Sequence, residues 1–192
     1  MKLNHSLMDN NLTKSDMHSV SKLIKKKDII LTQSKKVKEF EKKWSKWLGV
    51  KYSTFVNSGA SANLISINIL KELNKNKKEV ILPAFTWSSD VVAVINAGFK
   101  PVFVDIDFEN LALNENLVRK KINKNTLAIF ITHAMGFIGL TKKFIKFIKK
   151  KKIYLIEDVC ESHGARLGKK KSRDSWRNLK FFILLWSSYD NY

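Results

Sequence analysis

The sequence is poor in cysteine and arginine and has no long apolar run. Its 192 residues include one cysteine, Cys160, which excludes a disulfide framework and a four-cysteine metal or iron–sulfur site within the chain. No segment approaches the roughly 18 apolar residues that a membrane-spanning helix requires. The first residues, MKLNHSLMDNN, lack the apolar segment of a secretory signal. We therefore expect a soluble, cytoplasmic protein with no membrane partner.

The basic residues outnumber the acidic ones by 36 to 17, which gives a formal net charge of +19. Such a charge is typical of proteins that bind nucleic acid or an anionic surface. Only four of the basic residues are Arg, the residue suited to bidentate contacts with bases and phosphates. Lys, Asn and Ile are all abundant, and all three have AT-rich codons. The positive charge is therefore better explained by AT-rich codon usage, which places lysines on a solvated surface. A basic nucleic-acid-binding protein is the alternative from another functional class, and a steep salt dependence of binding would support it.

Apolar residues make up 44% of the chain and charged residues 28%, which excludes a collagenous or wholly disordered protein. The length is that of one ordinary domain with a real core. Two amphipathic helices are predicted near the start, over residues 15–27 and 35–48, and Gly49 stands where the second would be capped.

Strand and helix patterns alternate over the rest of the chain. A helix is expected from the NSGASA segment to about residue 73, followed by strands at 80–83, 101–106, 126–132 and 153–157, with helices at 88–97, 115–122 and 141–150 between them. Short strand–helix alternation predicts an α/β fold with a mostly parallel sheet covered by helices on both faces. No GxGxxG motif follows any strand, which argues against a dinucleotide-binding domain.

Ligands of such sheets bind at the carboxyl ends of strands and at helix N-termini. Three segments with suitable chemistry fall there. Residues 57–62 form a small-residue turn that enters a helix, where free N–H groups can hold a phosphate. Residues 83–87 offer an aromatic side chain after a strand. Glu157 and Asp158 end a strand, with His163 shortly after them.

Together these segments resemble the DegT/DnrJ/EryC1/StrS family of pyridoxal-phosphate (PLP) enzymes that act on nucleotide-linked keto sugars. The matching text is LTQSKKVKEFEKKW, VNSGASA, VILPAFTWSSDVVAVINAGFKPVFVDID and LIEDVCESHGARLGKK, within residues 7–171. The resemblance implies the large domain of a fold-type I PLP-dependent transferase. It also implies a nucleotide-sugar substrate such as a 4-keto-6-deoxy sugar, a role in cell-surface polysaccharide or lipopolysaccharide biosynthesis, and a homodimer in the intact enzyme.

The resemblance assigns cofactor contacts to individual residues. Gly59, Ala60 and Ser61 match the turn that binds the PLP phosphate. Trp87 matches the aromatic residue that stacks on the pyridine ring. Asp158 matches the carboxylate that pairs with the pyridinium nitrogen, which keeps the ring protonated as an electron sink.

Other positions depart from the family or leave two roles open. The family usually has Thr where this chain has Ala60, so one hydroxyl contact is missing. Glu161 stands where the aminotransferases commonly carry Gln, which weakens the case for plain transamination. His163 falls on a family His near the cofactor, with a packing role as the alternative. His133, at the end of a strand, is a candidate for the pocket rim, with surface exposure as the alternative.

The match to the family stops after residue 171. We expect an N-terminal arm and helix over 1–34, a partial PLP-binding large domain over 35–171, and an out-of-frame tail over 172–192 without strand or helix pattern, the small C-terminal domain being absent. With synonymous codons chosen to fit, a one-base shift of the tail continues the family pattern, and the single Trp186 codon then forces a Gly.

That shifted string places a His at the family's Schiff-base Lys position, beyond the frame break. A His there resembles the sugar 3-dehydratases, and the ordinary sugar aminotransferase is the alternative. The chain as written has no catalytic Lys or His at that position. It is predicted to bind PLP poorly and to be inactive.

Overall fold

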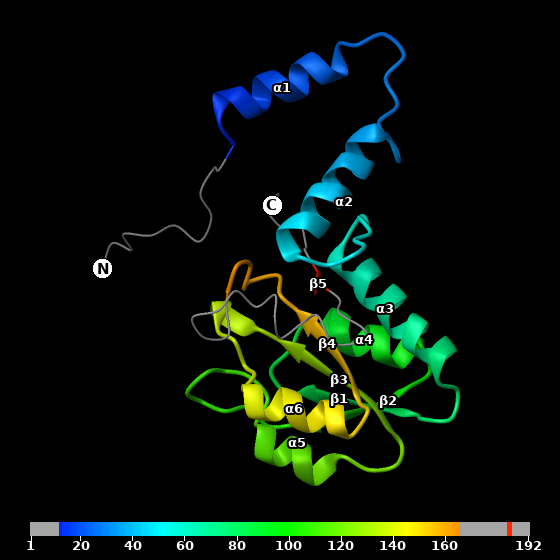
Figure 1. The fold of residues 1–192 in the computed structure, drawn as a ribbon, viewed down its shortest axis with the longest axis vertical. Helices are drawn as coiled ribbons and strands as arrows, with labels where there is room; N and C mark the ends of the chain where they lie inside the picture. The colour runs from blue at the N-terminus through cyan, green and yellow to red at the C-terminus, as the bar shows by residue number, and fades with distance from the viewer. Residues whose placement is uncertain (1–11, 166–183, 186–192) are drawn as a thin grey trace. The chain divides into compact units, whose positions relative to one another are not determined.

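The computed structural model describes residues 12–165 and 184–185 (Figure 1). Clustering of contacts divides them into two compact units, residues 12–55 and residues 56–165 with 184–185. Helix α1 (Lys14–Ile24) of the first unit begins at a capping box in which the Thr13 hydroxyl and the Asp16 carboxylate bond each other's backbone N–H. It ends three residues before its predicted end, and none of its residues is buried.

Helix α2 (Lys35–Leu48) has the predicted bounds, and Gly49 follows it in the left-handed conformation at φ 77°. Its aromatic stripe packs within this unit: the Phe40 and Trp44 rings stack at 5.8 Å, and Phe55 meets Phe40 edge-on at 5.4 Å. The Phe55 N–H also donates to the Glu41 carboxylate at 2.9 Å.

The second unit is built on a parallel sheet with the strand order β2-β1-β3-β4-β5. Its strands are β1 (Glu79–Pro83), β2 (Lys100–Val104), β3 (Thr126–Thr132), β4 (Tyr154–Asp158) and β5 (Leu184–Leu185). The four longer strands lie within two residues of their predicted bounds. Strand β2 forms one outer edge of this sheet and carries Pro101.

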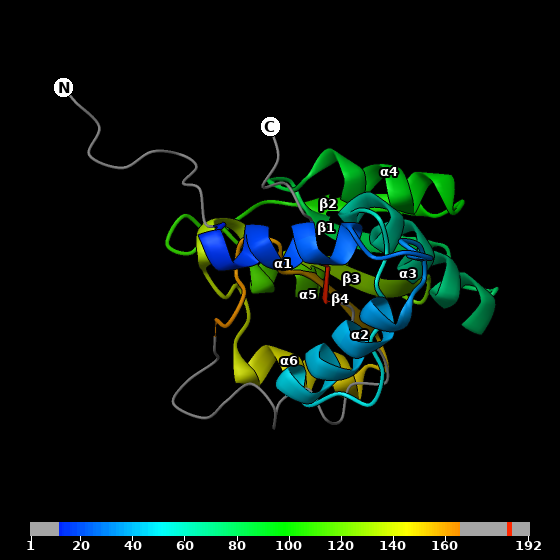
Figure 2. The same ribbon diagram turned by 90° about the horizontal axis from the view of Figure 1, so that it is seen from above.

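Helices cover both faces of this sheet, as Figures 1 and 2 show. They are α3 (Gly59–Leu73), α4 (Ser88–Asn96), α5 (Glu115–Lys121) and α6 (Lys142–Lys150), with a short 3₁₀ turn η1 (Ala134–Gly136) after β3. One buried cluster joins α3 and α4 to the sheet, and the other joins α5 and α6 to the opposite face. The predicted three-layer α/β architecture is confirmed.

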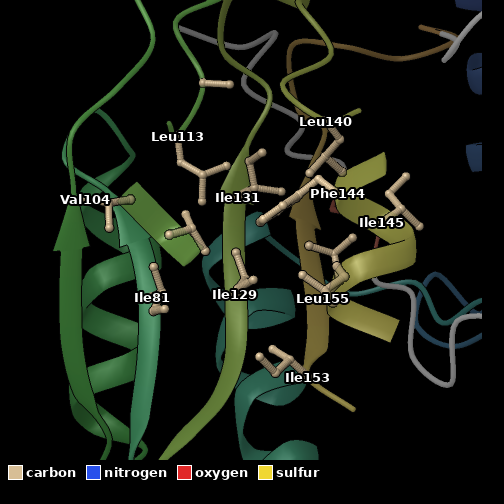
Figure 3. Close-up of a cluster of buried hydrophobic side chains, with 13 residues drawn as sticks. Ile81, Val104, Leu113, Ile129, Ile131, Leu140, Phe144, Ile145, Ile153 and Leu155 are labelled. Carbon is tan, nitrogen blue, oxygen red and sulfur yellow. The ribbon is translucent and has the colours of Figure 1, made fainter. Parts of the chain in front are cut away.

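The core on the α5/α6 face is almost wholly aliphatic (Figure 3). Ile129 and Ile131 of β3 and Leu155 of β4 point toward α6, which contributes Phe144 and Ile148. Every residue of β3 is buried, as expected for a strand covered on both faces. Among residues 12–165, no helix combines the length and apolar character that a membrane span requires.

Part of the proposed out-of-frame tail forms a strand although its sequence shows no strand pattern. Leu184 and Leu185 pair in parallel with Glu157 and Asp158 of β4. The outer edge of β4 carries unpaired backbone groups, which any extended segment can satisfy. The rest of the proposed out-of-frame segment, 172–183 and 186–192, lies outside the described residues.

Candidate functional site

The candidate site lies where the strand order of the sheet reverses. Strand β1 has β2, the next strand in sequence, on one side and β3 on the other. The connections that leave β1 and β3 therefore run to opposite sides, and open α/β sheets bind ligands in the crevice at the carboxyl ends of such strands. The ends of β1 and β3, Pro83 and Thr132, mark this point.

The N-terminus of α3 presents backbone donors. Ser58 caps the helix, and its hydroxyl accepts a hydrogen bond from the Ser61 N–H at 3.2 Å. Within the described part of the chain, the N–H groups of Gly59 and Ala60 have no acceptor. Free N–H groups at the positive end of a helix dipole suit an anion such as a phosphate.

Asp158 is the last residue of β4 and is 3% exposed. Side chains alternate along a strand, so Asp158 lies on the same face as Ile156, which packs against the α3/α4 cluster. Its Oδ1 accepts the Cys160 N–H at 2.9 Å, and no Lys or Arg of the described residues forms an ion pair with it. Partial burial lowers the pKa of His163. The negative charge of Asp158 lies close enough to oppose that lowering in part.

Trp87 occupies the N-cap position of α4 and is 51% exposed. Its side chain makes no capping hydrogen bond. A half-exposed indole at the carboxyl end of β1 is available to stack on a flat ligand.

Asp90 is a buried acid at this edge that the sequence reasoning missed. It is fully buried, and its Oδ2 accepts the hydroxyls of Thr86 at 2.7 Å and Thr132 at 2.8 Å. Its Oδ1 accepts the Asn63 amide at 2.7 Å and, more weakly, the Ser89 hydroxyl at 3.4 Å. An acid in the first turn of a helix commonly serves the helix dipole, so the sequence carries no signal that singles Asp90 out.

His133 lies on the other face of the sheet, paired with Glu157. The ring is 3% exposed, and its Nε2 is 2.7 Å from Glu157 Oε1. Its Nδ1 accepts the Gly139 N–H at 3.2 Å, which leaves the ring proton on Nε2 as the donor to Glu157. Burial raises the pKa of Glu157, although the bond from His133 opposes that rise.

Glu161 is exposed and joins two loops at this edge. Its Oε2 accepts the Met135 N–H at 2.6 Å, and Met135 has the left-handed φ of 57°. Glu161 thus holds the turn after β4 against η1. Among the described residues, no cluster of three or more His, Cys, Asp or Glu is placed to hold a metal ion.

The structure therefore separates the predicted site residues. Gly59–Ser61 and Trp87 belong to segments that the Asp90 carboxylate bonds through Asn63 and Thr86. Asp158 is the register partner of Thr132, which bonds the same carboxylate from β3. His133 is turned to the opposite face, and Glu161 is bonded to η1.

Curated proteins of similar sequence match most of the chain. A GDP-4-keto-6-deoxy-D-mannose 3-dehydratase of Yersinia pseudotuberculosis is 31% identical over 174 residues, covering 88% of this chain and 44% of that protein. A GDP-perosamine synthase of Vibrio cholerae is 30% identical over 142 residues, covering 74% of this chain and 38% of that protein. The chain thus spans less than half the length of the curated relatives it matches.

Solved structures share the fold. An E. coli GDP-4-keto-6-deoxy-D-mannose-3-dehydratase with bound hydrated PLP superposes with a TM-score of 0.76 at 27% identity, over 88% of this chain and 44% of that one. Helicobacter pylori PseC, an aminotransferase involved in the biosynthesis of pseudoaminic acid, superposes with a TM-score of 0.76 at 27% identity. The match covers 83% of this chain and 42% of PseC. The predicted fold class, that of fold-type I PLP-dependent transferases, is confirmed.

A sequence profile covers most of the chain, matching residues 10–174. That profile describes the DegT/DnrJ/EryC1/StrS aminotransferase family, the one predicted from the motifs. The chain belongs to this family.

Proposed function

We propose that this chain is part of a PLP-dependent enzyme that acts on a nucleotide-linked 4-keto-6-deoxy sugar in cell-surface polysaccharide biosynthesis. One observation carries the proposal: two backbone N–H groups, an exposed indole and a buried carboxylate lie at one edge of the sheet. Among residues 12–165 those N–H groups have no acceptor and the carboxylate has no Lys or Arg partner. The intact enzyme is proposed to be a homodimer, which the exposed apolar side chains of Ile65, Ile69 and Leu73 on α3 support.

The chemistry of these groups fits PLP. The N–H groups of Gly59 and Ala60 suit its phosphate, with Ser61 beside them. The Trp87 indole suits its flat ring, and the Asp158 carboxylate suits its protonated nitrogen. When bound, PLP supplies an electron sink for carbanion chemistry.

The electrostatics favour a cation beside Asp158. The Asp90 carboxyl lies close enough to Asp158 that the two charges interact. Within the described residues neither acid forms an ion pair with Lys or Arg. Two neighbouring acids in a buried setting stabilise a positive charge, so Asp158 holds the ligand nitrogen in its protonated form.

The 3-dehydratase is the proposed reaction class. It is supported by Glu161 in place of the aminotransferases' Gln and by GDP-4-keto-6-deoxy-D-mannose 3-dehydratases among the relatives, at 31% and 32% identity. The alternative is sugar amination, supported by GDP-perosamine synthase and PseC among the similar proteins.

The Schiff-base Lys or His position is proposed to lie beyond the frame break. The chain as written therefore binds PLP without a covalent bond, weakly, and has no turnover. Sequencing the gene across codons 168–192 tests the proposed frame: codons that cannot encode the family continuation contradict it.

A PLP titration of the 192-residue chain tests the cofactor site, followed by ligand absorbance and by quenching of Trp fluorescence. We expect saturable binding that D158N weakens by about tenfold or more, because the ligand nitrogen loses a charged partner. D28N is the matched control, since Asp28 is exposed in the other unit. Equal affinity in D158N and D28N would contradict the assignment, as would the absence of binding in the unmodified chain.

A further inference from the structure

Asp90 bonds two of the segments that carry a proposed cofactor contact, and it bonds the strand beside the third. Asn63, which donates to it, lies one turn into α3, four residues after Gly59. Thr86 immediately precedes Trp87. Thr132 is the register partner of Asp158 on the neighbouring strand.

We propose that Asp90 is a positioning residue that holds the proposed PLP cradle together, fixing α3, the Trp87 segment and the end of β3 beside Asp158 through one buried carboxyl. The inference rests on the proposed function for the identity of the ligand. Asp90 is fully buried, so it acts through its neighbours and not by touching the cofactor.

The oxygens around Asp90 form a closed triangle. Asp90 Oδ2 is 2.7 Å from the Thr86 hydroxyl and 2.8 Å from the Thr132 hydroxyl, and those two hydroxyls are 2.7 Å apart. Three short contacts need three hydrogens, and the two threonines supply only two. A proton on Asp90 Oδ2 completes the ring: Oδ2 then donates to one threonine hydroxyl and accepts from the other, while Oδ1 still accepts the Asn63 amide.

The surroundings favour that proton. Burial and the negative charge of Asp158 raise the pKa of Asp90 to about 6, although hydrogen bonds from Thr86, Thr132 and Ser89 oppose the rise. Asp158 of β4 is the charged group that faces Asp90; α3, β3 and the segment before α4 contribute only the uncharged groups named above. His163 faces Asp158 in turn.

A cation at Asp158 cancels part of the charge that keeps Asp90 protonated. Ligand binding there therefore releases the Asp90 proton, and by linkage the ionised form of Asp90 strengthens binding of a protonated ring nitrogen.

Hydrogen exchange of the full chain without PLP tests the positioning role. In D90A, peptides covering 58–66 and 84–90 are expected to exchange about tenfold faster, because four side chains lose their hydrogen-bond partner. D90N keeps the shape and mimics the protonated acid, so it should restore slow exchange.

Should D90A fail to fold, T132V carries the test. T132V removes one hydroxyl from β3. If Asp90 joins the segments, peptides 58–66 and 84–90 should still exchange faster, although they are distant in sequence from residue 132. T126V is the matched control: Thr126 is buried at the other end of β3, and its effect should stay near Asn123, whose N–H it binds. Acceleration limited to the substituted strand in T132V, or to the neighbourhood of residue 90 in D90A, overturns the inference.

PLP titrations of D90N and the unmodified chain test the linkage. The ratio of their dissociation constants is expected to be near one at pH 5 and about fivefold at pH 7, where only the native acid ionises. A constant ratio overturns the proton linkage. If no form binds PLP, the proposed function fails, and the exchange result still decides the role of Asp90. If PLP binds and exchange stays local, the function stands and this inference falls.

Discussion

The two faces of the sheet each bury an acid near its carboxyl edge, but they treat it differently. On the α3/α4 face, Asp90 accepts hydrogen bonds from three separate elements. On the α5/α6 face, Glu157 has one partner, His133, and its Oε2 has none among the described residues. The first acid connects segments, and the second anchors a single loop to β4.

The two acids differ in the groups that surround them on their own face of the sheet. Asp90 lies beneath accessible groups, including Trp87 at 51% exposure and the free N–H groups of α3. Glu157 points toward the aliphatic layer beneath α5 and α6. On the face with exposed groups the buried acid therefore joins separate segments, whereas on the closed face it fixes one strand end.

Removal of His133 is expected to have the largest effect on stability. H133A leaves the Glu157 carboxylate buried without its partner, and we expect a loss of about 3 kcal/mol in the free energy of unfolding. Urea denaturation followed by circular dichroism measures it. H18A, an exposed His of α1, should change stability by less than about 0.5 kcal/mol. A loss in H133A as small as that of the control would show that the pair is not a structural anchor.

The pH dependence of stability sharpens the contrast on the other face. Asp90 has a pKa of about 6 in the folded chain against an ordinary value of 3.8, so the folded state holds the proton more tightly. Its stabilising contribution is therefore complete below pH 3.8 and is lost as the pH rises through 6. We expect the stability of the native chain to fall by about 3 kcal/mol relative to D90N over this interval.

Urea midpoints of both proteins between pH 4 and 7 provide the measurement. Glu157 also has a raised pKa, but it is present in both chains and cancels in the difference. Parallel pH curves for the two proteins would mean that Asp90 is ionised throughout, contrary to the oxygen triangle.

The smallest expected effect concerns the binding face alone. Ala60 is exposed beside the free N–H groups of α3, so A60T places a hydroxyl there without a clash. One added hydrogen bond should tighten PLP binding by about fivefold with little change in stability. A60V has the same shape without the hydroxyl and should not tighten binding. Equal gains from both variants would assign the effect to packing.

The sequence predicted most of the fold because local signals and tertiary packing agree there. Helix α2 has its predicted bounds, since the Ser34 cap, the apolar stripe and Gly49 all point to the same ends. Helix α1 is shorter than predicted because its basic end makes no buried contact that would extend it. The Leu184–Leu185 pairing depends on an open strand edge, which no local pattern reveals.

The site was predicted only in part, for a related reason. Gly59–Ser61, Trp87 and Asp158 follow strands or begin helices, so their place at one edge could be inferred from the alternation. Asp90 and His133 acquire their roles from partners 42 and 24 residues away, Thr132 and Glu157. Such pairings arise from the packing of whole elements, and spacing in the sequence does not encode them.

Pro101 interrupts the row of backbone hydrogen-bonding groups at the free edge of β2. The Lys100 N–H bonds the Lys78 carbonyl, so the next residue turns its backbone outward at the free edge of β2. That residue is proline and has no N–H to offer. A strand from another molecule therefore finds an interrupted template at β2, which discourages edge-to-edge aggregation, and the intact template at β4 is used by the chain itself.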